Sequence, residues 1–256
     1  GGGGGVNRIA ILALAALLPA GPAMANGAAG PWDIQFTEPF ALNRDVPVID
    51  LDIDAPTQIR AAKARGQQVL CYVSVGTAEK WRSDYAQFPA EVKGPEWQEW
   101  PGEYFLDIRR QDILLPIMRA RFQACADAGA DAIDPDNQDQ QWAGAFAVTE
   151  ADTVSYMKAL AGIAAGIGLT IGQKNNPDTV DDLVGTLDFI VTEGCFAEGW
   201  CDSVLPYAVA GKPVYAIEYT NTFLDFAAAC TYGRAHGVSF ILKDLALDGQ
   251  TYQSCD

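Results

Sequence analysis

The 256-residue sequence lacks the signatures of several common catalytic and metal sites. It has one histidine, His236, and no C-x-x-C pair, so a zinc site would miss most of its usual ligands. It has no G-x-S-x-G motif, and a single histidine disfavours a Ser-His-Asp triad. No G-x-G-x-x-G follows the first predicted strand, which disfavours a dinucleotide-binding fold. We therefore expect neither a metal site nor a cofactor.

Basic residues are also scarce. The sequence contains 17 Lys and Arg against 33 Asp and Glu, which gives a net charge of −16. This balance argues against nucleic acids and anionic membranes as partners, and it suits a neutral or cationic substrate. On charge alone, acidity that only keeps a secreted protein soluble is the alternative.

Long apolar runs are limited to the N-terminal region. Ile9 to Leu18 forms an apolar run that is too short to cross a bilayer, which takes about 20 residues. Arg8 precedes the run, and Ala23-Met24-Ala25 resembles a signal-peptidase site before Asn26. We predict a signal peptide at residues 1–25 and one domain at residues 26–256; a retained membrane anchor is the alternative. The predicted mature protein is secreted or periplasmic, does not contact the membrane, and is a monomer.

Six cysteines are present, and an even number behind a signal peptide indicates disulfides. Six cysteines allow 15 connectivities, so the sequence does not fix the pairing. Cys195–Cys201 would close a short loop, and Cys230–Cys255 would tie the C-terminal tail to the last long helix. Cys71–Cys125 would remain as the third pair.

Apolar strands alternate with helical segments along the chain. This order is typical of a parallel sheet covered by helices. A long irregular stretch, residues 77–102, follows the third strand, and an extended segment at 104–108 belongs to the same excursion. Eight strands then remain, at residues 32–36, 47–52, 69–75, 131–134, 169–174, 188–192, 214–217 and 238–242. The sequence predicts an α/β fold, a single (β/α)8 TIM-type barrel with a long excursion after the third strand.

Polar side chains collect where these strands end. The clearest example is Ala130 to Asp139, an apolar strand that runs into a cluster of carboxyl and amide groups; Pro135, which lacks an N–H, indicates that the strand leaves the sheet there. In a parallel barrel such ends converge on one mouth, where active sites lie. The candidate substrate-binding residues are Gln35, Asp50, Tyr72, Ser74, Asp134, Asn137, Asp139, Lys174, Asn175, Glu218 and Tyr219, with Asp52 as the alternative to Asp50 at the end of its strand.

Two carboxylates that flank the scissile bond are the minimal equipment for glycoside hydrolysis. Asp136 and Glu193 follow the fourth and sixth strands, so they are the candidate catalytic pair. Asp134 is either a rival to Asp136 or a structural carboxylate. Lys174 has two interpretations, a Schiff-base nucleophile or a charge partner of the carboxylates. A calcium loop is disfavoured, because Asp134 to Asp139 lacks the ligand order and the glycine of such loops.

Tryptophans are frequent in the predicted loops. Trp81, Trp97, Trp100, Trp142 and Trp200 offer aromatic faces on which sugar rings stack, although some of them could simply fill the loop core.

An ordered set of short motifs resembles glycoside hydrolase family 114, the endo-α-1,4-polygalactosaminidases. The motifs are Cys71-Tyr72-Val73-Ser74-Val75-Gly76, Trp81-Arg82-x-Asp84, Gly102 to Arg109, Asp134-Pro135-Asp136-Asn137-x-Asp139, Lys174-Asn175, Glu193-x-Cys195-Phe196 and Glu218-Tyr219. The set extends over about residues 32 to 255, and its order is far more specific than any single motif.

The resemblance implies a barrel enzyme that is secreted and that hydrolyses α-1,4-linked galactosamine-containing polysaccharide with an Asp/Glu pair. Carried onto this sequence, it implies Asp136 as the nucleophile and Glu193 as the acid/base. Thr192-Glu193-Gly194 is less acidic than the same region of many relatives, which leaves the exact substrate open. The alternatives are a barrel glycosidase for another α-linked amino sugar and a carbohydrate-binding barrel without catalysis.

Overall fold

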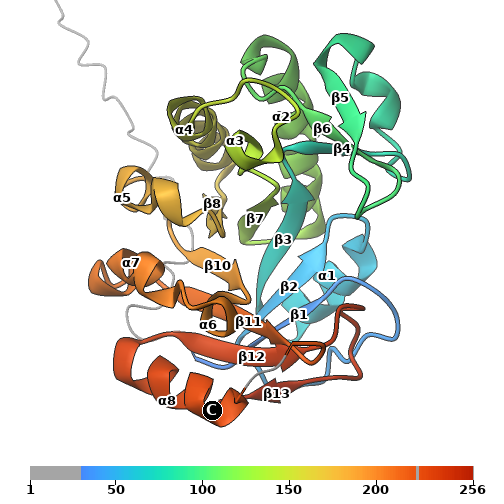
Figure 1. Ribbon diagram of the computed structural model, residues 1–256. Coiled ribbons are helices and arrows are strands. Elements are labelled where there is room, and N and C mark those ends of the chain that lie inside the picture. Colours follow the sequence, from blue (N-terminus) through green and yellow to red (C-terminus); the bar gives the residue numbers. More distant parts are fainter. Residues whose placement is uncertain (1–29, 223–224, 256) are drawn as a thin grey trace, which may run out of the picture.

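The computed structural model describes residues 30–222 and 225–255, and Figure 1 shows its arrangement. The predicted signal peptide lies outside these residues, and so does Phe223, at which the sequence predicts the start of the last long helix. The parallel strands are β1 (Trp32–Gln35), β2 (Val48–Asp52), β3 (Gln68–Ser74), β7 (Ala132–Asp136), β8 (Thr170–Ile171), β9 (Gln173–Lys174), β10 (Ile190–Glu193), β11 (Val214–Tyr219) and β12 (Ser239–Lys243). A short β13 (Gln253–Ser254) runs antiparallel to β12.

Backbone ladders join these strands into two five-stranded sheets, β1-β2-β3-β7-β8 and β13-β12-β11-β10-β9. The sheets meet where the chain runs from β8 to β9 through Gly172. The Gly172 N–H donates to Ile133 of β7 at 3.0 Å, and the Gln173 N–H donates to Phe189 at 2.9 Å. A Cβ on Gly172 would lie 2.3 Å from the Phe189 ring, so only glycine fits at this junction.

Side chains rather than a ladder close the opposite seam, between β12 and β1. In the part of the chain that the structure describes, no ladder pairs these two strands. The indole of Trp32 donates to the Ser239 carbonyl at 3.0 Å, and the Lys243 ammonium lies 2.9 Å from Asp33. Because Asp33 and Lys243 are both fully buried, each supplies the charge partner that the other requires.

Two apolar clusters flank the strands. One fills the space enclosed by the strands and includes Trp32, Ile34, Leu70, Phe189 and Ile241. The other packs the outer faces of the strands against the helices around them. The helices are α1 (Pro56–Ala64), α2 (Gln111–Ala128), α3 (Gln140–Ala143), α4 (Glu150–Ile167), α5 (Val180–Leu183), α6 (Cys195–Glu198), α7 (Leu205–Val209) and α8 (Phe226–His236), with short 3-10 turns η1 (Tyr85–Gln87), η2 (Ala90–Val92), η3 (Pro177–Thr179) and η4 (Cys201–Val204). The pattern Thr149-x-x-Asp152 predicts a capping box at the start of α4, and it is present, with Thr149 and Asp152 each bonding the other's backbone N–H.

The excursion after β3 forms a small antiparallel sheet beside the main strands (Figure 1). Its strands are β4 (Thr77–Glu79), β5 (Lys93–Glu96) and β6 (Glu103–Leu106), in the order β4-β6-β5. The α/β fold with an excursion at this point is therefore confirmed. The sequence did not reveal that residues 77–106 carry a sheet of their own.

The strand at Asp134 continues further than predicted. β7 runs through Pro135 to Asp136, and its ladder with β3 extends to the Ser74–Asp136 pair. Its ladder with β8 ends at the Ile133–Ile171 pair. From Pro135 onward β7 is thus paired on one side only, and this is the condition under which a strand tolerates proline.

The three predicted disulfides are confirmed. The Cα–Cα distances are 6.0 Å for Cys71–Cys125, 4.8 Å for Cys195–Cys201 and 5.1 Å for Cys230–Cys255. No helix of the described residues combines the length and apolar character that a membrane span requires.

Candidate active site

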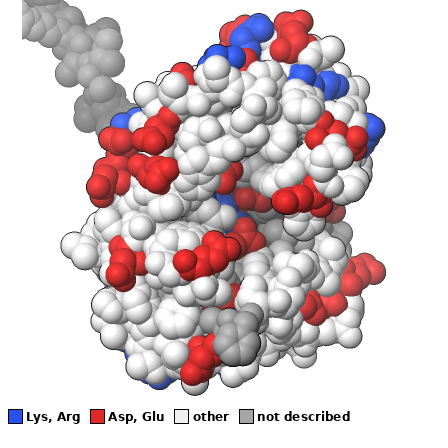
Figure 2. Space-filling model, in the orientation of Figure 1, with Lys and Arg blue, Asp and Glu red and all other residues white. Residues whose placement is uncertain are grey.

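A cavity of about 740 Å³ opens at the carboxyl ends of the parallel strands, next to the small sheet. Figure 2 shows a hollow on this face, in which acidic side chains surround a basic one. The cavity is lined by residues of the strand ends, the excursion and the segment after β12: Phe36, Thr37, Asp52, Asp54, Tyr72, Glu79, Trp81, Arg82, Trp97, Trp100, Glu103, Asp136, Asn137, Asp139, Lys174, Asn175, Glu193, Tyr219, Leu245, Ala246 and Leu247.

Asp136 enters the cavity from the last residue of β7. Its carboxylate accepts a hydrogen bond of 2.8 Å from the Tyr72 hydroxyl. Asn137 then turns the chain with a φ of 60°, a left-handed conformation that asparagine tolerates better than most residues, and donates to Ser74 at 2.9 Å. A Cβ on Gly76 would lie 1.7 Å from the Asn137 carbonyl, so glycine is required for this close crossing of the two strand ends.

Glu193 enters from the end of β10, on the other side of the cavity floor. Tyr219 of β11 donates a short hydrogen bond to one of its oxygens. The backbone N–H of Glu193 donates to the Asn175 side chain at 2.8 Å, and the Asn175 amide nitrogen lies 3.4 Å from the other carboxylate oxygen. The carboxylates of Asp136 and Glu193 are therefore each oriented by a tyrosine hydroxyl.

Lys174 also lines the cavity, and its charge acts on Asp136. Its ammonium is 2.9 Å from Asp134 and 3.9 Å from Glu193. Burial acts to lower the pKa of Lys174, but the charges of Asp134, Glu193 and Asp136 outweigh it and raise the pKa well above its usual value. Because a Schiff-base nucleophile needs a neutral amine, this environment favours the charge-partner interpretation.

Burial and the surrounding charges shift the ionisation of Asp136. Burial raises the pKa of Asp136 to about 7, and the negative charges of Glu193 and Asp134 add to this effect. Lys174 and the Tyr72 hydroxyl act in the opposite direction. Asp136 therefore changes charge near neutral pH.

The excursion supplies the outer wall of the cavity. Arg82 forms ion pairs with Asp52 at 2.5 Å, with Glu79 at 2.8 Å and with Asp54 at 3.1 Å, and so ties the small sheet to β2. Trp81 and Trp100 remain 56% and 51% exposed beside this network, which leaves their aromatic faces open to a ligand.

The structure brings most of the predicted site residues together. The cavity lining includes both candidate catalytic residues and six of the substrate-binding candidates: Tyr72, Asn137, Asp139, Lys174, Asn175 and Tyr219. The other candidates are fully buried and do not line the cavity: Gln35, Asp50, Ser74, Asp134 and Glu218. Gln35 bonds Asp33 and Ala41, and Ser74 supports Asn137, so both have structural partners.

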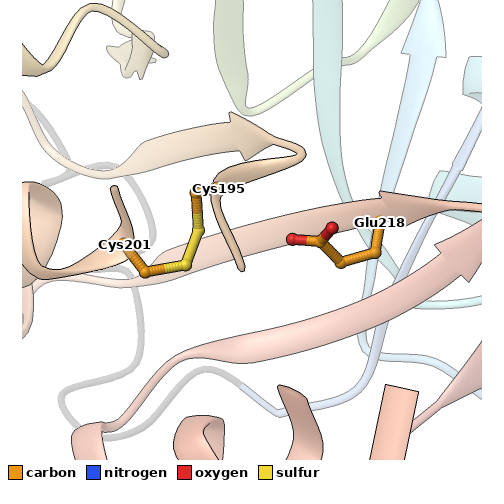
Figure 3. Close-up of side chains that lie close together, drawn as sticks. All are labelled: Cys195, Cys201 and Glu218. Carbon is orange, nitrogen blue, oxygen red and sulfur yellow. A yellow bond between two sulfur atoms is a disulfide. The ribbon is translucent and has the colours of Figure 1, made fainter. Parts of the chain in front are cut away.

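Glu218 faces away from the cavity because side chains alternate along β11 and its neighbour Tyr219 faces inward. Its carboxylate accepts the backbone N–H groups of Phe196 and Ala197, at 2.7 and 3.3 Å. Figure 3 shows it beside the Cys195–Cys201 disulfide. In the described ranges, 30–222 and 225–255, these three residues are the one group with metal-ligand spacing, but sulfurs joined in a disulfide cannot bind a metal as thiolates.

Asp52, the alternative to Asp50, lies one pleat beyond it, nearer the mouth, and lines the cavity. Several other cavity residues were not predicted. Asp54, Glu79, Arg82 and Glu103 belong to the excursion or its contacts, whose position cannot be read from the sequence.

Comparisons with known proteins agree with this geometry. The model of glycoside-hydrolase family GH114 matches residues 15–256. The crystal structure of Aspergillus fumigatus Ega3 in complex with galactosamine superposes with a TM-score of 0.81 at 28% identity, covering 91% of this chain and 98% of that chain. The glycoside hydrolase domain of PelA from Pseudomonas aeruginosa shares the fold, with a TM-score of 0.64 at 15% identity, covering 88% and 98% of the two chains.

The α-galactosidase TtGalA from Thermus thermophilus also shares the fold, with a TM-score of 0.56 at 11% identity, covering 86% of this chain and 59% of that chain. No curated protein matches the sequence. The chain belongs to glycoside-hydrolase family GH114, and it is a glycoside hydrolase.

Proposed function

We propose that the protein is an endo-glycosidase that hydrolyses α-1,4-linked galactosamine-containing polysaccharide, with Asp136 and Glu193 as its catalytic pair. The observation that carries this proposal is the position of the two carboxyl groups. They come from two strand ends, line one cavity, and are coupled strongly enough for the charge of Glu193 to raise the pKa of Asp136. A carboxyl pair of this kind is what glycoside hydrolysis requires.

The surroundings of the two groups suggest different roles. A tyrosine hydroxyl bonds each of them, so the tyrosines do not distinguish the two, but the Glu193 side chain is 30% exposed in the cavity lining. The group that protonates the leaving oxygen, and later activates water, needs such access to solvent. We therefore assign Asp136 as the nucleophile and Glu193 as the acid/base.

In the proposed first step, an Asp136 oxygen forms a bond to the anomeric carbon. The bond between this carbon and the glycosidic oxygen breaks, and the oxygen takes the proton of Glu193. In the second step Glu193 accepts a proton from water, and the resulting hydroxide displaces Asp136 from the sugar. Lys174, next to both carboxylates, limits the build-up of negative charge when Asp136 is ionised.

The charge of the cavity supports an amino sugar as the substrate. Seven acidic and two basic residues line the cavity, and Arg82 is already paired with Asp52, Asp54 and Glu79. The ammonium groups of a partly deacetylated polymer would be attracted to the remaining cavity carboxylates, which are not paired with Arg82. The structural relative Ega3 was crystallised with galactosamine, which agrees with this class of sugar.

The exposed tryptophans support a polymer rather than a monosaccharide. Trp81 and Trp100 line the same cavity and extend its apolar surface beyond the carboxyl pair. Aromatic faces of this kind stack on sugar rings.

We also propose that the enzyme acts outside the cytoplasm, because its three disulfides suit an oxidising compartment.

The test is incubation of purified protein with galactosaminogalactan, with released oligosaccharides identified by mass spectrometry. Wild type should release short galactosamine oligomers, while Asp136→Asn and Glu193→Gln should lose several orders of magnitude in rate and still bind the polymer. Asp182→Asn, an exposed residue of α5, serves as the control and should match wild type. Binding without release by wild type would instead indicate a carbohydrate-binding barrel, and release only from another amino-sugar polymer would correct the substrate.

A further inference from the structure

A buried carboxyl group lies beneath the active site and takes no part in the proposed mechanism. Asp50 is on β2, between Ile34 of β1 and Leu70 of β3 in the ladder, and both neighbours belong to the apolar cluster inside the strands. Its side chain therefore faces the enclosed interior, and the residue is 0% exposed. An ionised carboxylate in such a place needs a positive partner or hydrogen-bond donors.

Asp50 has neither among the described residues. Neither of its carboxyl oxygens receives a hydrogen bond from an N–H or from a hydroxyl group. The carboxyl group of Asp134 acts on Asp50 from close by, and one oxygen of Asp134 likewise receives no hydrogen bond from an N–H or from a hydroxyl group. Two carboxyl groups form such a contact only when one of them carries a proton.

The proton belongs to Asp50 rather than to Asp134. The other oxygen of Asp134 lies 2.9 Å from the Lys174 ammonium, which stabilises Asp134 as an anion. Burial and the charge of Asp134 both raise the pKa of Asp50, with a smaller contribution from Asp52, whereas the more distant Lys174 lowers it. Of the neighbouring strands, β1 presents Ile34 and β3 presents Leu70 and Tyr72, so no further charge faces Asp50 from them.

We propose that Asp50 is a positioning residue that stays protonated below the active site, donates a hydrogen bond to Asp134, and thereby holds the Lys174 ammonium beside Asp136 and Glu193. The chain of contacts runs from Asp50 to Asp134, from Asp134 to Lys174, and from Lys174 to Glu193. In this arrangement Asp134 balances the charge of Lys174, and Asp50 adds no second negative charge. The part that concerns catalysis rests on the proposed function, whereas the protonation of Asp50 does not.

Two substitutions at one position test the proposal. Asparagine keeps the shape and a donor toward Asp134 and has no charge, so Asp50→Asn should leave kcat/KM within about threefold of wild type, with an unchanged acid limb of its pH profile. Leucine removes the donor and leaves one oxygen of Asp134 without a partner, so Asp134 no longer holds Lys174 firmly beside Asp136. Because the charge of Lys174 lowers the pKa of Asp136, Asp50→Leu should lower kcat/KM about tenfold and move the acid limb to higher pH by about 0.5 unit or more.

Each other outcome contradicts the proposal. If Asp50 were an anion that balances Lys174, then Asp50→Asn would itself move the acid limb to lower pH. If the Asp50 side chain served only to fill space in the core, then Asp50→Leu would reduce thermal stability without moving the acid limb of the pH profile.

An infrared measurement decides the protonation of Asp50 even if no substrate is turned over. With ¹³C-labelled aspartate at pH 8.5, wild type should show the C=O stretch of a protonated carboxylic acid, and Asp50→Asn should lack it. Absence of this band from wild type would overturn the proposal, while its presence in a protein without turnover would refute only the proposed function.

Discussion

Replacing Asp136 by asparagine should make the folded protein more stable above neutral pH while it abolishes turnover. Burial raises the pKa of Asp136 from its usual 3.8 to about 7, so ionising it costs the folded state free energy. A pKa difference of this size corresponds to about 4 kcal/mol. Because Asp136 borders an open cavity and water solvates part of it, we expect about half of this value, about 2 kcal/mol.

The sign of the effect follows from proton binding. Between pH 4 and 7 the folded protein holds a proton on Asp136 that the unfolded chain has lost, so the stability of wild type falls as pH rises through this range. The asparagine variant has no such proton to lose, and its amide oxygen can still accept from Tyr72. The two proteins should have similar stability near pH 4, and the difference should reach its full size above about pH 7.

Chemical denaturation at pH 4, 6, 7 and 8.5, with the disulfides intact, measures this difference. Asp182→Asn is the matched control, because the same change on the exposed surface of α5 should leave the curve close to that of wild type. An Asp136→Asn variant that is less stable than wild type at pH 8.5, or a difference that does not depend on pH, would refute the reasoning.

Four further predictions concern activity and stability. The kcat/KM of wild type should rise with pH through about 7, because Asp136 must ionise before it can attack; a rate that already plateaus below pH 5 would contradict this role. Tyr219→Phe removes the hydroxyl that donates to Glu193 and should lower kcat/KM about tenfold with an unchanged circular dichroism spectrum; an unaltered rate would argue against Glu193 as a catalytic group. Glu218→Gln should reduce the free energy of unfolding by about 1–2 kcal/mol while kcat/KM stays within a few fold, because Glu218 bonds the backbone of α6 and not the cavity; a large loss of rate at unchanged stability would place Glu218 in the site. Trp81→Ala and Trp100→Ala should each raise KM for the polymer about two- to tenfold, whereas Trp142→Ala, an exposed tryptophan that does not line the cavity, should not; equal effects of all three would exclude specific stacking.

Local patterns in the sequence were sufficient for the parallel strands and the longer helices and for their order. Thr149 and Asp152 mark the start of α4 because a capping box depends only on residues three positions apart. The disulfide Cys71–Cys125 followed only after the two shorter pairs had been chosen, because no local pattern joins residues 54 positions apart. The antiparallel sheet of the excursion was not predicted, since its pairing depends on contacts between β6 and strands on both of its sides.

The site shows the same division between local and long-range information. Clustering of acids at strand ends identified Asp136 and Glu193 as cavity residues. It could not tell which of Glu218 and Tyr219 lines the cavity, because that depends on which alternate residues of β11 face inward. The inward face could be inferred from Tyr215 and Ile217, which share the face of Tyr219 and pack inside the strands. Asp52, rather than Asp50, lines the mouth for the same reason, because it is the last inward-facing residue of its strand.

The most direct test of the account is a crystal structure of Glu193→Gln with a galactosamine oligomer bound. The account predicts one glycosidic bond spanning the cavity floor, with its oxygen in hydrogen-bond contact with residue 193 and its anomeric carbon about 3–3.5 Å from an Asp136 oxygen. An oligomer bound elsewhere, or one whose sugars contact only one of the two residues, would contradict the assignment of Asp136 and Glu193 as a catalytic pair.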